Sequence, residues 1–278
     1  MAGLAAGCAA DGDDSSGPPP PSCSATTYRV SRVTLPATWG DSAALALDVD
    51  GDGDLDNKLG SLEATLTQVY GNWHPDVALA SMLASRSTGW LLKVERCEGS
   101  PRLAVSLGVG TDADGDGAFE VADWGEPAVG SGQVARGGVG ALPVARLGDG
   151  TGSPDGDDGW APELGLAVSI QPGARDFTAT IGMGVEVTDE LLAPVAGFLT
   201  AALQAGDSRF AAGIDLDHDG TVSVTELRQA AAVRTLLSSD LDLTIPCDTG
   251  ECYQPNTDGL ADRISIGFGI TAVPVRVD

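Results

Sequence analysis

Hydrophobic and polar residues alternate along much of the chain from residue 28 onward, as they do in half-buried strands. Each alternating segment is bounded by Gly, Pro or Asp, which favour turns. Residues 125–160 are especially rich in these turn formers, so we expect a long irregular region there. The pattern predicts six strands, at residues 28–35, 89–96, 102–109, 164–170, 177–187 and 263–277.

Three other segments have helical periodicity. Residues 59–69 place an apolar side chain every three or four positions, which gives one apolar face. Thr188 followed by Asp-Glu is typical of a capped helix start with acidic residues in the first turn. A third helix is expected over residues 224–237. These patterns predict an α+β fold, mostly antiparallel β in a sandwich-like sheet, with a C-terminal helical insertion.

Composition and charge narrow the range of partners. Of 278 residues, 42% are hydrophobic, which is enough to bury a core. Asp and Glu total 40 against 15 Lys and Arg, so the formal net charge is −25. This charge excludes nucleic acid and anionic lipid as partners attracted by electrostatics.

Residues 1–8 end in Leu-Ala-Ala-Gly-Cys, which resembles the lipobox of bacterial lipoprotein signals. The resemblance implies that residues 1–8 are a signal remnant, that Cys8 is lipidated, and that the membrane is contacted only through this lipid anchor. Seven residues are too few for a complete signal, so either the reading frame starts upstream of Met1 or the likeness is accidental. The polar, Pro-rich residues 9–27 are expected to form a disordered tether, and residues 28–278 a single domain. The implied location is the bacterial cell envelope, or outside the cell.

Five cysteines are present, and setting Cys8 aside leaves four that can pair in three ways. Cys247 and Cys252 bracket a short loop, which favours a local bridge, and Cys23 would then pair with Cys97. Disulfides imply an oxidising compartment. The alternative is four buried free thiols in a reducing one.

The spacing Asp-x-Asp-x-Asp-Gly occurs three times, starting at Asp48, Asp112 and Asp215. Alternate Asp side chains in a tight loop can converge on one point, and the Gly permits the sharp turn. Calcium accepts six to eight hard oxygen ligands at irregular positions, whereas magnesium demands a stricter octahedron. The motif therefore predicts Ca²⁺ as the bound ion, two or three per chain.

The loop at Asp215 resembles an EF-hand at every ligand position, within an EF-hand-like segment at residues 210–237. The resemblance implies seven ligand oxygens. They come from Asp215, Asp217 and Asp219, the Thr221 carbonyl, a water held by Ser223, and both carboxylate oxygens of Glu226.

The other two loops match the same pattern less completely. At the second, the ligands implied are Asp112, Asp114, Asp116, the Ala118 carbonyl, Glu120 and Asp123, and the alternative is an acidic hairpin turn. At the first, they are Asp48, Asp50, Asp52, the Asp54 carbonyl and Asp56. Position 12 of the first loop is Leu59, which cannot ligate, so Asn57 or an acid from elsewhere must complete the shell.

The chain as a whole resembles predicted secreted bacterial lipoproteins with Asp-rich calcium loops, a likeness that implies no activity. We expect a structural or binding protein that uses calcium as a structural staple, with a glycan or another envelope protein as a further partner. The alternatives are a carbohydrate-binding protein and a calcium-supported glycoside hydrolase, although no carboxylate pair can be singled out as catalytic. Carbohydrate binding would use exposed indoles, and the alternative is that these side chains fill the core at strand ends; the candidates are Trp39, Trp73, Trp124 and Trp160.

Overall fold

The structure is a computed structural model that describes most of the chain. The described residues are 22–71, 73, 80, 83–84, 88–137, 139–143, 160–171, 177–207, 209, 211–247 and 250–278. The expected signal remnant, Cys8 and most of the expected tether lie outside these residues.

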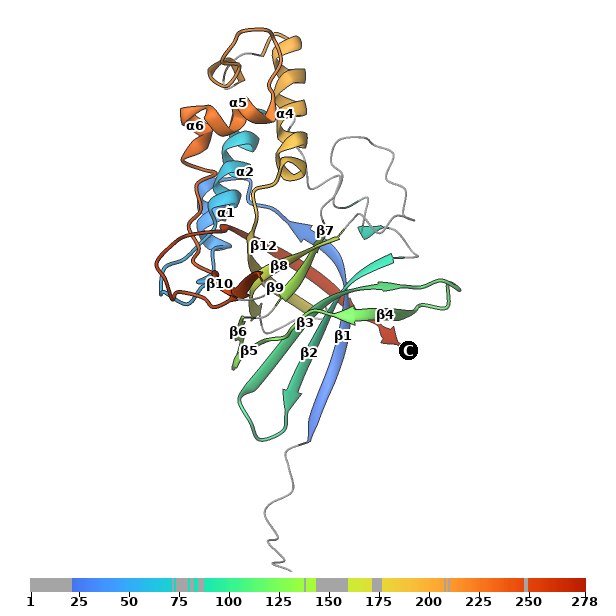
Figure 1. Ribbon diagram of the computed structural model, residues 1–278. Coiled ribbons are helices and arrows are strands. Elements are labelled where there is room, and N and C mark those ends of the chain that lie inside the picture. The colour runs from blue at the N-terminus through green and yellow to red at the C-terminus, as the bar shows by residue number, and fades with distance from the viewer. Residues whose placement is uncertain are drawn as a thin grey trace, which may run out of the picture.

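An eleven-stranded sheet dominates the fold, and eight of its strands close into a ring (Figure 1). Neighbours in the ring are antiparallel throughout. In spatial order the ring consists of β3 (Arg102–Thr111), β2 (Thr88–Cys97), β1 (Cys23–Thr34), β12 (Ile264–Pro274), β9 (Phe177–Val185), β8 (Trp160–Gln171), β6 (Val134–Arg136) and β5 (Ala128–Ser131), which pairs with β3.

The expected mostly antiparallel β architecture is therefore confirmed, but the sandwich-like arrangement is wrong, because the sheet is a closed barrel. Closure occurs because β3 divides one edge between two partners. Its residues 102–105 pair with β5, and residues 108–111 pair with β4 (Ala118–Trp124). Inward and outward positions alternate in the same way in a sandwich and in a barrel, so the sequence pattern could not separate the two.

The region expected to be irregular contributes three short strands, β5, β6 and β7 (Val139–Pro143), which pairs with β8. The sequence predicts only a weak strand here, at residues 141–147, which overlaps β7; β5 and β6 are four and three residues long, too short for alternation to mark them. The last strand, β13 (Arg276–Val277), pairs in parallel with β4 outside the ring.

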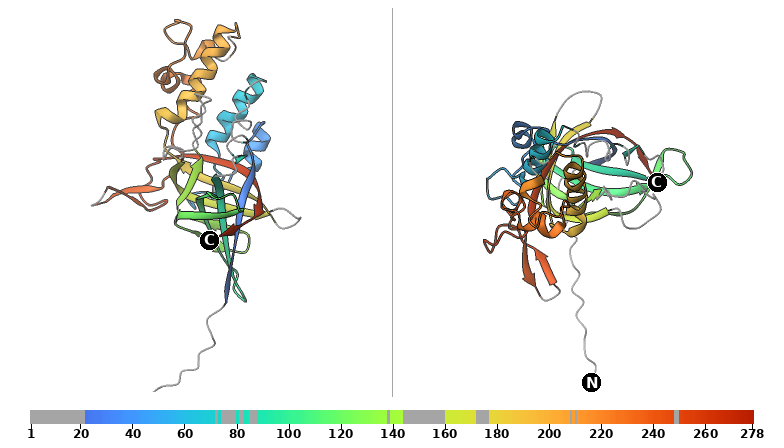
Figure 2. Two further views of the ribbon diagram at one scale, coloured as in Figure 1. Left: turned by 90° about the vertical axis from the view of Figure 1, so that its right-hand side faces the viewer. Right: turned by 90° about the horizontal axis from the view of Figure 1, so that it is seen from above.

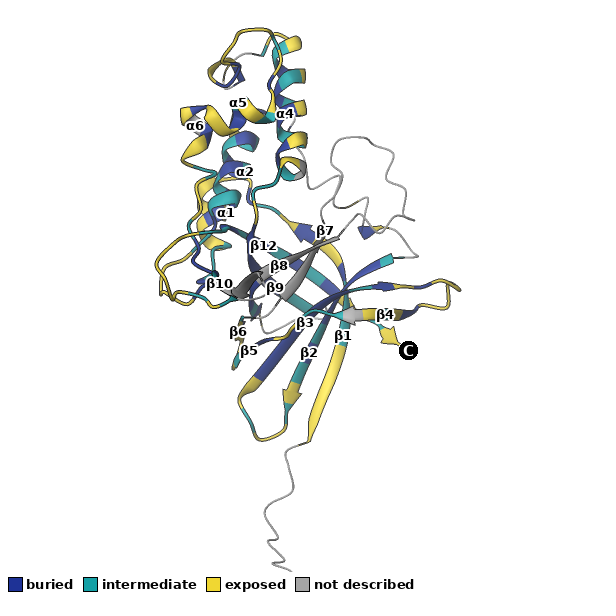
Figure 3. Ribbon diagram, viewed as in Figure 1, coloured by how far each residue is buried: buried dark blue, intermediate teal, exposed yellow. Residues whose placement is uncertain are grey.

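The interior of the barrel is a packed hydrophobic core. Trp90, Leu92, Val105, Ile181 and Phe268 are all buried in it, from four different strands. In Figure 3, β2 and β3 are mostly buried, whereas the helices have one buried and one exposed face. Burial of these large side chains stabilises each by about 1.5–3 kcal/mol relative to exposure, so the barrel holds the fold together.

The helices stand together over one end of the barrel (Figure 2). They bury a second core between them, which includes Leu62, Leu66, Leu192 and Leu199. No helix in the described part of the chain is both long and apolar enough to cross a membrane. The helices are α1 (Trp39–Ala44), α2 (Lys58–Val69), α4 (Asp189–Gln204), the 3-10 turn η1 (Ala211–Gly213), α5 (Val224–Gln229) and α6 (Ala231–Arg234).

Two of the three expected helices are confirmed, as α2 and as α4 with its Thr188 cap. The third is divided, because the backbone at Ala230 leaves the helical region between α5 and α6. The expected EF-hand-like insertion is not found as a helix–loop–helix. The described residues before the loop form only the three-residue turn η1, which ends at Gly213, a poor helix former.

The expected Cys23–Cys97 disulfide is present and joins the paired ends of β1 and β2. Because β1 begins at Cys23, residues 23–27 belong to the domain and not to the tether. Cys247 and Cys252 lie on β10 (Thr244–Cys247) and β11 (Gly250–Tyr253), a separate two-stranded hairpin. Their side chains lie outside the described residues, so the second bridge stays a prediction.

The connection between α1 and α2 docks on the outside of the barrel over glycines. Val49 packs there with Leu241 and Leu243 in a small third core. A Cβ on Gly184 would lie only 2.2 Å from Leu243 Cδ1, and one on Gly182 only 3.0 Å from Val49 Cγ2. The absence of side chains at these positions of β9 lets the loop lie directly on the sheet.

Asn57 joins this connection to the barrel. Its Oδ1 accepts hydrogen bonds from the Gly60 N–H at 3.1 Å and the Gly267 N–H at 2.7 Å. Its Nδ2 donates to the carbonyl oxygens of Ser42 at 3.0 Å and Gly267 at 3.1 Å. The residue is buried, so one side chain caps α2 and fixes both helices on β12.

We expect Asn57→Ala to lower the free energy of unfolding by about 3 kcal/mol, because it removes a cap and leaves buried backbone groups without partners. Urea denaturation at constant calcium concentration measures the loss. The matched control is Thr38→Ala, which removes the exposed cap of α1 and should cost about 1 kcal/mol. Equal losses in the two variants would show that Asn57 is an ordinary cap.

Candidate metal centres

Three groups of aspartates, each on a different connection of the fold, could hold a metal ion. In each group, one carboxylate oxygen per residue lies within 4.8 Å of the others. The groups are Asp48, Asp50, Asp52 and Asp56 between α1 and α2; Asp112, Asp114 and Asp116 between β3 and β4; and Asp215, Asp217 and Asp219 between η1 and α5. The sequence spacing therefore brings the expected aspartates together in all three loops.

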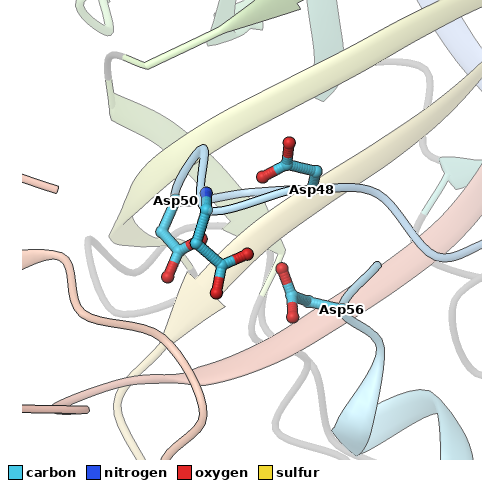
Figure 4. Close-up of side chains that lie close together, drawn as sticks. Asp48, Asp50 and Asp56 are labelled. Atoms are coloured by element: carbon cyan, nitrogen blue, oxygen red, sulfur yellow. The ribbon is translucent and has the colours of Figure 1, made fainter. Parts of the chain in front are cut away.

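The Asp48 loop is closed by a short antiparallel bridge between Leu47 and Asp56. Val49 points into the third core and is almost fully buried, which orients its neighbours Asp48 and Asp50 the other way. Both aspartates are nonetheless only 8% exposed. Figure 4 shows the carboxylates of Asp48, Asp50 and Asp56 gathered around the turn.

Backbone amides hold these carboxylates in place. The Gly51 N–H donates to Asp48 Oδ1 at 2.8 Å, and the Asp52 N–H donates to Asp50 Oδ1 at 3.2 Å. Gly51 has a φ of 89°, which an L side chain rarely adopts. These contacts fix the shape of the loop and hold its oxygen ligands close together.

The electrostatics of this group disfavour four negative charges. Burial raises the pKa of Asp56 to about 7, and the charges of Asp50, Asp240 and Asp52 add to the effect, against a lowering hydrogen bond from the Val49 N–H. Burial also raises the pKa of Asp50. Because the ionised forms are costly here, a bound cation would stabilise the loop strongly.

The structure shows that Asn57 cannot complete this group. Its amide is consumed by the four hydrogen bonds that fix α2 to β12. Leu59 lies inside α2 and packs against the hydrophobic cores. Asp54 has an exposed side chain outside the group, so its expected contribution is the carbonyl oxygen alone.

Sequence reasoning missed three residues that approach the loop from distant positions. The Asp242 N–H donates to Asp50 Oδ2 at 3.4 Å, and Arg136 Nη2 lies 3.0 Å from Asp48 Oδ2. Asp240 raises the pKa of Asp56. Asp242 is itself buried, and its Oδ1 has no hydrogen-bond partner among the described residues. Asp and Leu alternate over residues 240–243, a pattern that indicates that both acids lie on one side of the segment. Only the folded structure shows that this side lies against the Asp48 loop.

The Asp112 loop connects β3 and β4 as a hairpin. Its first aspartate is largely buried and accepts from two glycines: the Gly115 N–H donates to Asp112 Oδ1 at 2.8 Å, and the Gly117 N–H to Oδ2 at 3.1 Å. Asp114 and Asp116 are exposed. Each of these two accepts one backbone hydrogen bond, Asp114 from the Asp116 N–H at 3.2 Å and Asp116 from the Ala118 N–H at 2.8 Å. This loop therefore has one buried ligand and two that are exposed to solvent.

The remaining residues expected at this loop are not all brought to the group. Ala118 starts β4, and Glu120 is an exposed residue of the same strand, outside the group. The side chain of Asp123 lies outside the described residues. Arg276 on β13, which the sequence did not indicate, places its Nη2 3.1 Å from Asp116 Oδ2 and so ties the last strand to the loop.

The Asp215 loop holds its carboxylates most tightly. The Asp219 N–H donates to Asp215 Oδ1 and to Asp217 Oδ1, each at 3.1 Å, and the Gly220 N–H donates to Asp215 Oδ2 at 3.1 Å. The Thr221 hydroxyl donates to Asp219 Oδ1 at 2.6 Å. These bonds fold the loop around its three aspartates.

Glu226, the expected bidentate ligand, lies outside this group of carboxylates. Its Oε2 accepts from the Ser223 N–H at 2.8 Å and the Ser223 hydroxyl at 2.9 Å, which forms the capping box of α5. Its Oε1 accepts from the Leu216 N–H at 2.8 Å. These bonds, led by that from the Ser223 backbone, lower the pKa of Glu226 and keep it ionised and close to the loop. Its coordination of an ion, and the water on Ser223, stay predictions.

Comparison with protein families, curated proteins and solved structures finds no match to this chain. The chemistry of the site is therefore inferred from its own residues.

We expect Asp50→Asn to stabilise the metal-free protein, because it removes a buried negative charge from the group while keeping an oxygen for the Asp52 N–H. The change gives up only the long hydrogen bond, 3.4 Å, from the Asp242 N–H to the second oxygen. The raised pKa of Asp50 gives the sign: its ionised form opposes folding near neutral pH. The gain should be on the order of 1 kcal/mol, the repulsion of one like-charged neighbour. Thermal melts in chelator measure it, with Asp54→Asn as the matched control. A destabilised Asp50→Asn protein would show that repulsion in this loop is unimportant.

Proposed function

We propose that this protein binds calcium at all three aspartate loops, and that the ions act as structural staples. The observation that carries the proposal is the convergence of carboxylate oxygens within 4.8 Å at three separate loops. Carboxylates this close together repel one another, in a chain whose net charge is already −25. A bound cation would neutralise that repulsion.

The donor set favours calcium among the common divalent ions. Every ligand offered is a hard oxygen, and the carboxylates of each loop differ in their degree of burial. Magnesium requires a near-ideal octahedron and retains its waters, and zinc prefers nitrogen or sulfur ligands. The expected shell of the Asp215 loop, completed by Thr221, Glu226 and a water, fits calcium by its resemblance to the EF-hand.

The position of each loop supports a stapling role. The Asp48 loop joins the two helices to the outside of the barrel through Val49. The Asp112 loop contacts the last strand through Arg276. The Asp215 loop is bound to α4, because the Val222 N–H donates to Thr200 Oγ1 at 2.8 Å. An ion in each loop would fix a junction between elements that are distant in sequence.

The proposed setting is the bacterial cell envelope or the space outside the cell. Calcium-binding modules outside the cytosol bind at about 10⁻⁴–10⁻³ M, where an ion serves structure and not signalling. The Cys23–Cys97 disulfide fits an oxidising compartment. Lipidation of Cys8 would supply the anchor.

Thermal melting in calcium and in chelator tests this function. A ligand present at 100 times its Kd stabilises the folded state by about 2.7 kcal/mol per site, so three sites would contribute about 8 kcal/mol. The Tm should therefore rise by more than about 10 °C in millimolar calcium, and by much less in the same concentration of magnesium. Identical melts in calcium and chelator, for protein first stripped of metal, would refute the proposal.

Variants of single ligands test which loop binds most tightly. We expect Asp215→Ala and Glu226→Gln to weaken calcium binding, measured by titration calorimetry, more than Asp56→Ala and Asp123→Ala do. The reason is that only the Asp215 loop has a complete set of expected ligands. Loss of the tightest site in Asp56→Ala or Asp123→Ala instead would contradict this ranking.

A further inference from the structure

An open groove of about 350 Å³ runs beside the Asp48 loop. It lies between α1 and the start of α2. Two carboxylates and one ammonium group line it. Its lining includes Trp39, Leu55, Asp56, Lys58, Ser61 and Asp240. A groove of this volume is at the lower end of the range for small-molecule sites, large enough for one or two sugar rings.

The rim of the groove carries two exposed apolar side chains. Trp39 is 53% exposed and Leu55 is 69% exposed. None of the described residues hydrogen-bonds to the Trp39 indole N–H. The capping box of Thr38 and Asp41 fixes the backbone of the first turn of α1, which carries the exposed indole at its first position. An exposed indole offers a flat apolar face together with an N–H donor.

Other tryptophans differ from Trp39 in this respect. Trp73 is 8% exposed and donates its indole N–H to Glu63 Oε2 at 2.8 Å. Trp90 is buried in the barrel. Trp124 is half-buried, and the Lys93 ammonium lies 5.1 Å from its ring centre. These rings serve packing, whereas packing does not explain the exposure of Trp39 at the groove.

The groove also shares a residue with the first aspartate group. Asp56 lines the groove and belongs to the cluster with Asp48, Asp50 and Asp52. An ion bound by that cluster would therefore lie at the wall of the groove. The loop offers four carboxylates and the Asp54 carbonyl, which amount to five ligands if each carboxylate gives one oxygen. Calcium takes six to eight ligands, so one or more positions remain for oxygens from outside the loop.

We propose that this groove binds a carbohydrate, with its ring stacked on Trp39 and two hydroxyls coordinated to the calcium ion of the Asp48 loop. This inference rests on the proposed function, because it needs an ion at that loop. Neighbouring hydroxyls of a pyranose are neutral hard oxygens and meet the requirement of calcium. The Lys58 ammonium and the Asp240 carboxylate supply a donor and an acceptor for further hydroxyls.

The charge of the groove supports a neutral polyol over an anion. Asp56 and Asp240 face it together with the single cation Lys58, on a chain of net charge −25. Even with a calcium ion bound, the carboxylates of the loop and of Asp240 outweigh the charges of the ion and of Lys58, so a phosphate or sulfate group would be repelled.

Saturation-transfer NMR with a panel of methyl pyranosides of the gluco, galacto, manno and fuco series tests the inference. Each sugar is added at millimolar concentration to the full chain, in calcium and in chelator, and calcium binding to the same samples is measured by calorimetry. Trp39→Ala is compared with Trp124→Ala, a tryptophan outside the groove. We expect at least one pyranoside to bind in calcium only, about tenfold more weakly to Trp39→Ala and unchanged to Trp124→Ala.

The possible outcomes distinguish failure of the carbohydrate site from failure of the proposed calcium binding. Normal calcium binding with no bound pyranoside would overturn the carbohydrate site and leave calcium stapling intact. A pyranoside that binds equally in chelator, or equally to Trp39→Ala, would overturn the assignment to this groove. Absence of calcium binding in the wild type would contradict the proposed function itself, and the carbohydrate site with it. Trp39→Ala should keep its calcium affinity, because no ligand of the ion is changed.

Discussion

Carboxylates held within 4.8 Å of one another repel, and the proposed role of calcium in this protein follows from that repulsion. The chain folds with three such groups and a net charge of −25, and it buries four of the aspartates almost completely, namely Asp48, Asp50, Asp112 and Asp215. Burial is the main cause of the raised pKa of Asp56, and the charges of neighbouring carboxylates add to it. Arg136 and Arg276 offset part of the charge with one ion pair each. A divalent cation in each loop would turn the same repulsion into a source of stability.

The barrel positions the Asp48 loop through contacts made by the protein itself. Glycines on β9 let Val49 and Leu243 lie against the sheet, and Asn57 fixes the connection between α1 and α2 to β12. Packing and hydrogen bonds therefore add to any bound cation in positioning the aspartates beside Val49. A ligand loop that is ordered in this way loses less conformational entropy when it binds an ion.

The sequence predicted the features that have a local cause. Alternation located the long strands, leucine spacing located α2, the Thr188 cap located α4, and the Asp-x-Asp-x-Asp-Gly spacing located the three groups. Features with a tertiary cause were not predicted. They are the closure of the barrel by pairing of β3 with β5, the hydrogen bonds of the Asn57 amide to β12, and the position of Asp240 and Asp242 beside the Asp48 loop. The position of Glu226 shows the same limit, because its capping box and its expected ligand role arise from the same spacing.

The central claim is that the three carboxylate groups are cation sites. The most direct test is to count calcium bound per chain by equilibrium dialysis and elemental analysis, in the wild type and in three variants that each carry two Asp→Asn changes in one loop. The account predicts three ions per wild-type chain in millimolar calcium, and one fewer in each variant. A wild-type chain that retains no calcium, or a count that no variant lowers, would contradict it.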